Sequence, residues 1–114
     1  MTGDVATVFV VDDDPAARNA VAAVVESMGV NVRAFPSAES FLAAYDPSAT
    51  GCLVSDVRML GMSGLGLLER LGGSGANVSL PVILITAFAD VPLAVRAMQL
   101  GAATLLEKIG RAHV

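Results

Sequence analysis

Four short apolar runs in this chain each lead into polar side chains that could do chemistry. The side chains after the four runs are Asp12-Asp13-Asp14, Asp56, Thr86 and Glu107-Lys108. Short runs rich in β-branched residues are typical of buried parallel strands, and ligands sit at the carboxyl ends of such strands. Those ends would gather the four aspartate carboxylates, one hydroxyl and one ammonium in one crevice. Because uncompensated like charges are costly, the cluster predicts a cation and a phosphoryl group.

Magnesium is the cation that these side chains suit. Mg²⁺ is typically held by one or two carboxylates, with waters and a phosphate completing its octahedron. Asp12 and Asp13 at one strand end, and Asp56 at the next, would supply the carboxylates. The metal would leave Asp56 ionised as a nucleophile toward phosphorus. Thr86 would donate its hydroxyl to one phosphoryl oxygen, and Lys108 would neutralise another.

The elements that must position these residues alternate between strand and helix. Strands are predicted over residues 7–11, 30–35, 52–56, 80–86 and 103–106, each joined to the next through a helical segment. This order predicts an α/β fold with a doubly wound, five-stranded parallel sheet and helices on both faces. The chain stops where one more helix should cover the sheet, so the final helix of such a fold is expected to be lacking.

The first predicted helix carries an apolar stripe. It starts at Asp14-Pro15, a capping side chain followed by proline in the first turn, and ends at Gly29. Its apolar stripe at i, i+3, i+4 and i+7 consists of Val21, Val24, Val25 and Met28. The pattern predicts that this stripe packs against the sheet.

Bulk composition narrows the class of protein. A length of 114 residues allows one domain, and 54% hydrophobic with 16% charged residues indicates a globular chain. A net charge of −4 without a basic stripe argues against nucleic-acid binding by this segment. One cysteine, Cys52, fits a reducing cytoplasm, and no run approaches the length of a membrane span. We therefore expect a cytoplasmic domain with no membrane partner.

Residues 109–114 do not fit the pattern. The hexapeptide Ile-Gly-Arg-Ala-His-Val is what the common short-read sequencing adapter encodes in one frame, ATC GGA AGA GCA CAC GTC, before the stop TGA. We interpret these residues as adapter read-through and residues 1–108 as the native domain, truncated at its C-terminus. On this interpretation the last two bases of the Lys108 codon would also come from the adapter, although the position of the lysine suits the fold. A natural short tail is the alternative, and resequencing the source locus decides between them.

Several motifs together resemble the receiver domain of two-component response regulators. They are Val10-Val11-Asp12-Asp13-Asp14, Ser55-Asp56-Val57-Arg58-Met59, Met62-Ser63-Gly64, Leu84-Ile85-Thr86-Ala87 and Glu107-Lys108. They follow the order and approximate spacing of the family from Thr7 to Lys108. The segment from Thr86 to Pro92 is similar to the FixJ-like branch. The resemblance implies the flavodoxin-like sheet of CheY and its relatives.

The family implies a role for each matching position. Asp56 would be the phosphoacceptor, Asp13 a direct Mg²⁺ ligand, and Asp12 a ligand through the metal's water shell. The backbone carbonyl of Arg58 would complete the metal site. The switch hydroxyl would belong to Thr86, and the phosphate would pair with Lys108. Such a domain is a signalling module that assists its own phosphoryl transfer, rather than a free-standing enzyme.

The resemblance also implies partners. A sensor histidine kinase would donate the phosphoryl group. Membership of the FixJ-like branch implies a DNA-binding output domain outside this sequence, so transcription would be the process controlled. A homodimer through the face of the fourth helix and fifth strand is a further partner to consider.

Two departures from the family pattern bear on mechanism. Leu60 stands where the family commonly has proline, which predicts a less rigid loop after the phosphoacceptor. Leu105 stands at the usual aromatic switch position, so coupling of a ring to Thr86 would be replaced by leucine repacking.

Other readings of these residues remain open. An apolar strand before Asp12-Asp13-Asp14 also resembles haloacid-dehalogenase phosphatases, in which Asp12 would form the covalent intermediate, but Ala16 departs from their pattern. A degenerate receiver that serves only for docking is the third reading. Asp14 is expected to be a helix cap and Glu107 a solvated charge.

Overall fold

The computed structural model describes residues 6–72 and 80–108. Their elements, in chain order, are β1 (Thr7–Val11), α1 (Pro15–Ser27), β2 (Asn31–Phe35), α2 (Ala38–Ala44), β3 (Gly51–Asp56), α3 (Gly64–Gly72), β4 (Val82–Thr86), α4 (Val91–Gln99) and β5 (Thr104–Glu107). All four strand pairs are parallel, and the sheet order is β2-β1-β3-β4-β5. The predicted α/β doubly wound, five-stranded parallel sheet is confirmed, and the described residues form four helices. Residues 109–114, interpreted above as read-through, lie outside the described residues.

Local sequence signals set several helix ends. The Asp14 side chain accepts a hydrogen bond from the Ala16 amide, and Pro15 occupies the first turn of α1. Ser37 and Ser40 form a capping box at the start of α2. The Asp90 carboxylate accepts from the Leu93 amide at the start of α4. These caps satisfy amides that have no partner inside their helix, which favours the start of each of the three helices at its cap.

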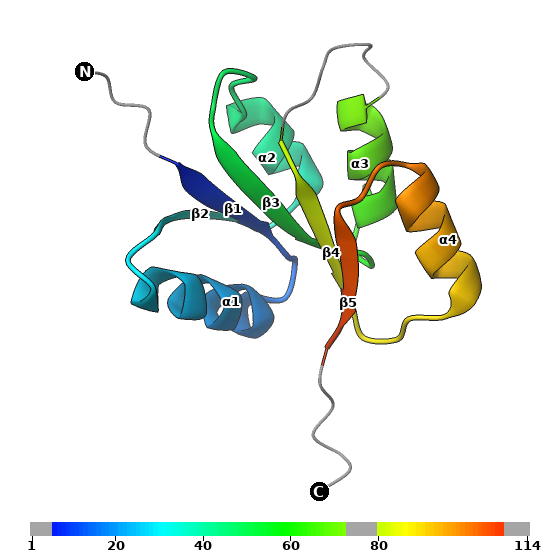
Figure 1. Ribbon diagram of the computed structural model, residues 1–114. Coiled ribbons are helices and arrows are strands. Elements are labelled where there is room, and N and C mark those ends of the chain that lie inside the picture. Colours follow the sequence, from blue (N-terminus) through cyan, green and yellow to red (C-terminus); the bar gives the residue numbers. More distant parts are fainter. Residues whose placement is uncertain (1–5, 73–79, 109–114) are drawn as a thin grey trace, which may run out of the picture.

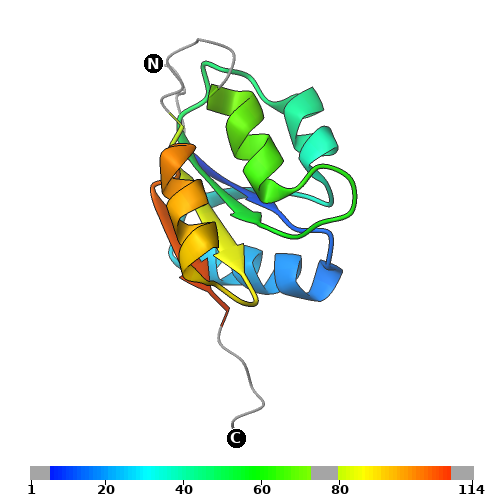
Figure 2. The ribbon, with the colours of Figure 1, turned by 90° about the vertical axis from the view of Figure 1, so that its right-hand side faces the viewer.

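Helices cover the two faces of the sheet unequally. Figures 1 and 2 show α1 on one side of the sheet and α2, α3 and α4 on the other. The larger face holds a continuous apolar cluster in which Phe41 of α2 is fully buried, with its ring 5.4 Å from that of Phe9 and 5.5 Å from that of Phe35. Burying one such side chain contributes roughly 1.5–3 kcal/mol. This core holds β1 and β3 together at the site.

The apolar stripe predicted on the first helix is only partly covered, so its predicted burial is wrong for two residues. Val24 is 62% exposed and Met28 66% exposed, and α1 has no fully buried residue. Leu106 of β5, on the same side of the sheet, is 49% exposed. The reason is that only α1 covers this face within the described residues. In those residues, no helix is long and apolar enough to cross a membrane.

Candidate functional site

Asp12 lies directly after β1 and is almost fully buried, with 4% of its surface exposed. Its carboxylate Oδ1 accepts a hydrogen bond from the Asp14 amide at 3.0 Å. Its backbone carbonyl accepts from Nη1 of Arg18 at 2.9 Å. The buried turn after β1 is therefore held from both its side chain and its backbone.

Asp13 and Asp14 have different surroundings although they are adjacent. Asp13 Oδ2 accepts a hydrogen bond from the backbone amide of Leu60 at 2.8 Å, which links the turn after β1 to the loop after β3. Asp14 caps α1, as predicted. The structure brings together three of the four carboxylates expected in the crevice, because Asp14 turns to the helix.

Asp56 ends β3 and faces the two aspartates. Asp12, Asp13 and Asp56 each offer an oxygen, and these three oxygens lie within 4.8 Å of one another. Burial raises the pKa of Asp56 above its ordinary value, and the nearby Asp12 carboxylate raises it further, while Lys108 opposes both effects. Such a cluster favours any cation that can neutralise it.

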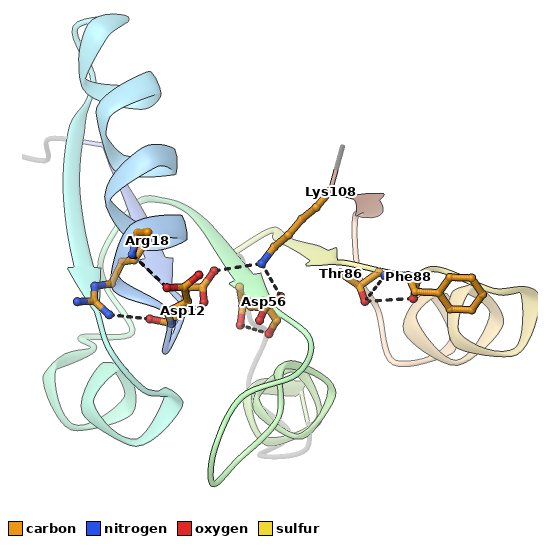
Figure 3. A network of polar contacts seen from close by, with 9 residues as sticks. Asp12, Arg18, Asp56, Thr86, Phe88 and Lys108 are labelled. Atoms are coloured by element: carbon orange, nitrogen blue, oxygen red, sulfur yellow. Dashed lines mark hydrogen bonds and ion pairs between the residues drawn. The ribbon is translucent and has the colours of Figure 1, made fainter. Parts of the chain in front are cut away.

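Lys108 follows β5 and reaches across the sheet ends, as Figure 3 shows. Its Nζ lies 3.6 Å from Asp12 Oδ2 and 3.5 Å from Asp56 Oδ1. Burial alone would lower the pKa of this lysine, but the Asp12 and Asp56 carboxylates outweigh burial and raise it. The ammonium therefore stays charged beside Asp56.

Thr86 ends β4, and 1% of its surface is exposed. Its hydroxyl donates to the Phe88 carbonyl at 3.2 Å, and its oxygen accepts from the Phe88 amide at 3.3 Å. Figure 3 shows this pair on the opposite side of Asp56 from Asp12. Phe88 itself is 63% exposed. Thr86 thus ties the loop after β4 to the strand end.

A cavity of about 410 Å³ lies between the loop after β3 and the loop before α4. Its lining includes Arg58 and Met59 on one side and Phe88, Asp90 and Leu93 on the other. This cavity opens next to the strand ends that carry Asp56 and Thr86. It leaves space into which the loop after β4 could shift.

The loop after β3 folds back tightly on its strand. The Gly64 amide donates to the Val57 carbonyl at 2.8 Å, and a Cβ at Gly64 would lie 2.3 Å from the Asp56 carbonyl oxygen. Only glycine permits this approach. The Met62 amide donates to Glu39 Oε2 of α2 at 3.0 Å. Leu60 was expected to make this loop less rigid. In the structure, hydrogen bonds from the Leu60 and Met62 amides to the carboxylates of Asp13 and Glu39 hold the loop in place.

The remaining predicted site residues lie around this centre. Leu105 of β5 pairs in register with Leu84 and packs against the core beneath α4, and Glu107 is exposed as expected. Three contributors were missed in the sequence: Arg18, Glu39 and the Leu60 amide. Arg18 follows the helix cap Asp14 by four residues, which is about one helical turn, and this spacing was a local signal that Arg18 lies near the strand end. Glu39 and the Leu60 amide act over long sequence separations, for which no local signal exists.

The donor set suits a magnesium ion. Three carboxylate oxygens converge at the carboxyl ends of two adjacent strands, and Mg²⁺ prefers oxygen ligands of this kind. One of them, Asp12, is buried among groups that hold its orientation. The residues present therefore fit the metal that the sequence predicts.

Comparison with known proteins agrees with this geometry. The family described as the response regulator receiver domain matches residues 8–113. The chain belongs to this family. Its FixJ-like branch is shown by the transcriptional regulatory protein FixJ of Azorhizobium caulinodans, 52% identical over 101 residues that make up 89% of this chain and 47% of the relative. The haloacid-dehalogenase alternative is not favoured.

Solved structures of similar receivers share the fold. The crystal structure of FixJ-N superposes with a TM-score of 0.80 at 39% identity, covering 99% of this chain and 88% of that one. The response regulator StyR gives a TM-score of 0.81 at 42% identity, covering 94% of this chain and 53% of that one. This receiver domain spans about half the length of the curated relatives that it matches.

Proposed function

We propose that this receiver accepts a phosphoryl group on Asp56 from the phosphohistidine of a sensor histidine kinase. An oxygen of Asp56 attacks phosphorus, an O–P bond forms, and the N–P bond breaks with its electron pair leaving on the imidazole, which then takes a proton. The observation that supports the proposal is the convergence of Asp12, Asp13 and Lys108 on Asp56. This arrangement offers a nucleophile and the charges that a transferring phosphoryl group requires.

Magnesium would be held by Asp13 and Asp56, with Asp12 acting through the water shell and the Arg58 carbonyl completing the site. Bound there, the ion would supply positive charge to the phosphoryl oxygens and cancel the repulsion among the carboxylates. Asp12 is fixed by the Asp14 amide, so its carboxylate is already oriented. Lys108 carries a second positive charge and would move its contact from Asp56 to the phosphoryl group.

Thr86 would couple phosphorylation to the rest of the domain. A hydroxyl has one hydrogen to donate, and that of Thr86 is directed to the Phe88 carbonyl. If the hydroxyl turns to a phosphoryl oxygen on Asp56, the Phe88 carbonyl loses this donor. The loop from Ala87 to Asp90 is then biased to a new position, and α4 follows. The non-aromatic Leu105 would repack beneath α4 in this step.

The partner surface proposed for the phosphorylated state is the outer face of α4 with β5. Val91, Val95 and Met98, at i, i+4 and i+7 of α4, are 74%, 49% and 53% exposed. We propose that a homodimer forms through this face. An output domain outside this sequence would bind DNA, since the FixJ relatives, about half of whose length this chain covers, are transcriptional regulatory proteins.

Labelling of Asp56 tests the proposed function. With Mg²⁺ and acetyl phosphate, the domain should form an acyl phosphate, and beryllofluoride should bind. Asp56→Asn should reduce both to background, more than 100-fold, because the amide is not a nucleophile. Asp14→Asn is a matched control, since Asp14 caps α1 outside the cluster. Labelling that survives in Asp56→Asn would favour a phosphatase-like Asp12, and a wild type without labelling would favour a docking module.

A further inference from the structure

The loop between β3 and α3 is held by carboxylates from two other elements. The Leu60 amide donates to Asp13 Oδ2 at 2.8 Å, and the Met62 amide donates to Glu39 Oε2 at 3.0 Å. Asp13 follows β1 at the proposed metal site, whereas Glu39 lies in the first turn of α2. The two amides are two residues apart, so the loop is fixed from both sides.

Residue 60 contributes through its backbone. The Leu60 side chain is 82% exposed, so replacing it would change little packing. Its N–H is the group that reaches Asp13. Proline, which the family commonly has at this position, carries no N–H and could not make this bond. Leucine here therefore adds a donor to the site.

The Leu60 bond bears on how Asp13 meets a cation. Oδ2 of Asp13 accepts the hydrogen bond from the Leu60 amide, and an oxygen of the same carboxylate lies within 4.8 Å of oxygens of Asp12 and Asp56. Hydrogen bonds to metal-binding carboxylates hold them in a binding orientation and affect metal affinity about 10–100-fold. We propose that the Leu60 N–H is a positioning group for Mg²⁺ binding through Asp13. This inference rests on the proposed function of the site.

Glu39 also helps to hold the loop that carries the Leu60 amide. A Cβ at Gly61, which has a φ of +76°, would lie 2.9 Å from Glu39 Oε2, so the loop passes close to this carboxylate. By holding the Met62 amide, Glu39 keeps the loop where the Leu60 amide can reach Asp13. Its effect on Mg²⁺ is therefore indirect and smaller than that of the Leu60 amide.

A titration of the ¹⁵N-labelled 114-residue chain with MgCl₂ alone, followed by amide chemical shifts, tests the inference. Leu60→Ala keeps the N–H and should bind Mg²⁺ within twofold of the wild type. Leu60→Pro removes the N–H and should bind about tenfold more weakly. Glu39→Ala should fall between the two. Equal affinity in Leu60→Pro and Leu60→Ala would overturn the inference.

Amide exchange provides a readout that needs no variant, should Leu60→Pro fail to fold by circular dichroism. In the wild type, the Leu60 amide should exchange with solvent at least tenfold more slowly than an unbonded loop amide, with and without Mg²⁺. Exchange at the rate of an unbonded amide would overturn the inference. A wild type that binds no Mg²⁺ overturns the proposed function and this inference together, whereas an insensitive Leu60→Pro overturns the inference alone.

Discussion

The site at the strand ends has two parts, an acidic half made of Asp12, Asp13, Asp56 and Lys108 and a second half made of Thr86 and the loop at Phe88. The acidic half is held by more polar contacts than the Thr86 half, and the Thr86 half includes the exposed Phe88. Backbone amides of Asp14 and Leu60 bind Asp12 and Asp13, and Lys108 pairs with Asp12 and Asp56. Thr86 contacts the backbone of Phe88, a residue that is 63% exposed and lines a cavity. The difference indicates that accepting a phosphoryl group needs prearranged charge, while responding to it needs a segment with room to move.

We expect the largest loss of phosphorylation rate on replacing Lys108, which belongs to the acidic half. Lys108→Ala removes the cation 3.5 Å from Asp56 and should slow acyl-phosphate formation from acetyl phosphate by about 100-fold. Phosphate-affinity gel electrophoresis measures the rate. Lys108→Arg keeps the charge and should lose less. A rate for Lys108→Ala within twofold of the wild type would show that the acidic half works without its cation.

Replacing Thr86 should separate phosphorylation, which depends on the acidic half, from the response to it, which depends on the Thr86 half. Thr86→Ala leaves the acidic cluster intact, so acyl phosphate should form at a rate within about tenfold of the wild type. Without the hydroxyl, the loop at Phe88 has no link to Asp56, and self-association induced by beryllofluoride should be lost in analytical ultracentrifugation. Thr86→Ser keeps the hydroxyl and should restore it. Unchanged self-association in Thr86→Ala would contradict the assignment of the switch.

The smallest expected effect is on how the stability of the metal-free domain depends on pH, through Asp56 of the acidic half. The pKa of Asp56 is raised in the folded state, so the folded state binds this proton more tightly than the unfolded state. The group therefore adds stability at low pH that is lost as pH rises through its folded pKa. Asp56→Asn should be more stable than wild type near pH 7 by on the order of 1 kcal/mol, or about 4–8 °C in Tm.

Thermal melts in EDTA at several pH values between about 7 and 4 measure that difference. It should shrink as pH falls, because the wild type gains a proton on Asp56 and the variant does not. Hydrogen bonds from Ser48 lower the pKa of Asp46, so this group makes stability fall as pH falls. Because Asp46 is present in both proteins, its contribution cancels in the difference. A difference that is constant or grows toward low pH would contradict the raised pKa of Asp56.

Much of the fold was predictable because its signals are local. Short apolar strands, the caps Asp14, Ser37 and Asp90, and the glycine after α1 each act within a few residues. The convergence of Asp12, Asp56, Thr86 and Lys108 also followed, since parallel strands place their carboxyl ends on one edge. Prediction was poorer for the stripe of α1, because apolar periodicity tells which side chains share a face but not whether anything covers it.

The order of strands and helices, the polar residue at each strand end and the family of the motifs can all be read from the residues in chain order. The meeting of particular oxygens and amides cannot: Asp13 with Leu60, Glu39 with Met62, and Thr86 with the Phe88 backbone were found only in the folded domain. The two kinds of feature differ in the sequence distance over which they act. Strand and cap preferences depend on neighbouring residues, whereas a hydrogen bond across 47 residues depends on where the packed sheet and helices leave two chain segments.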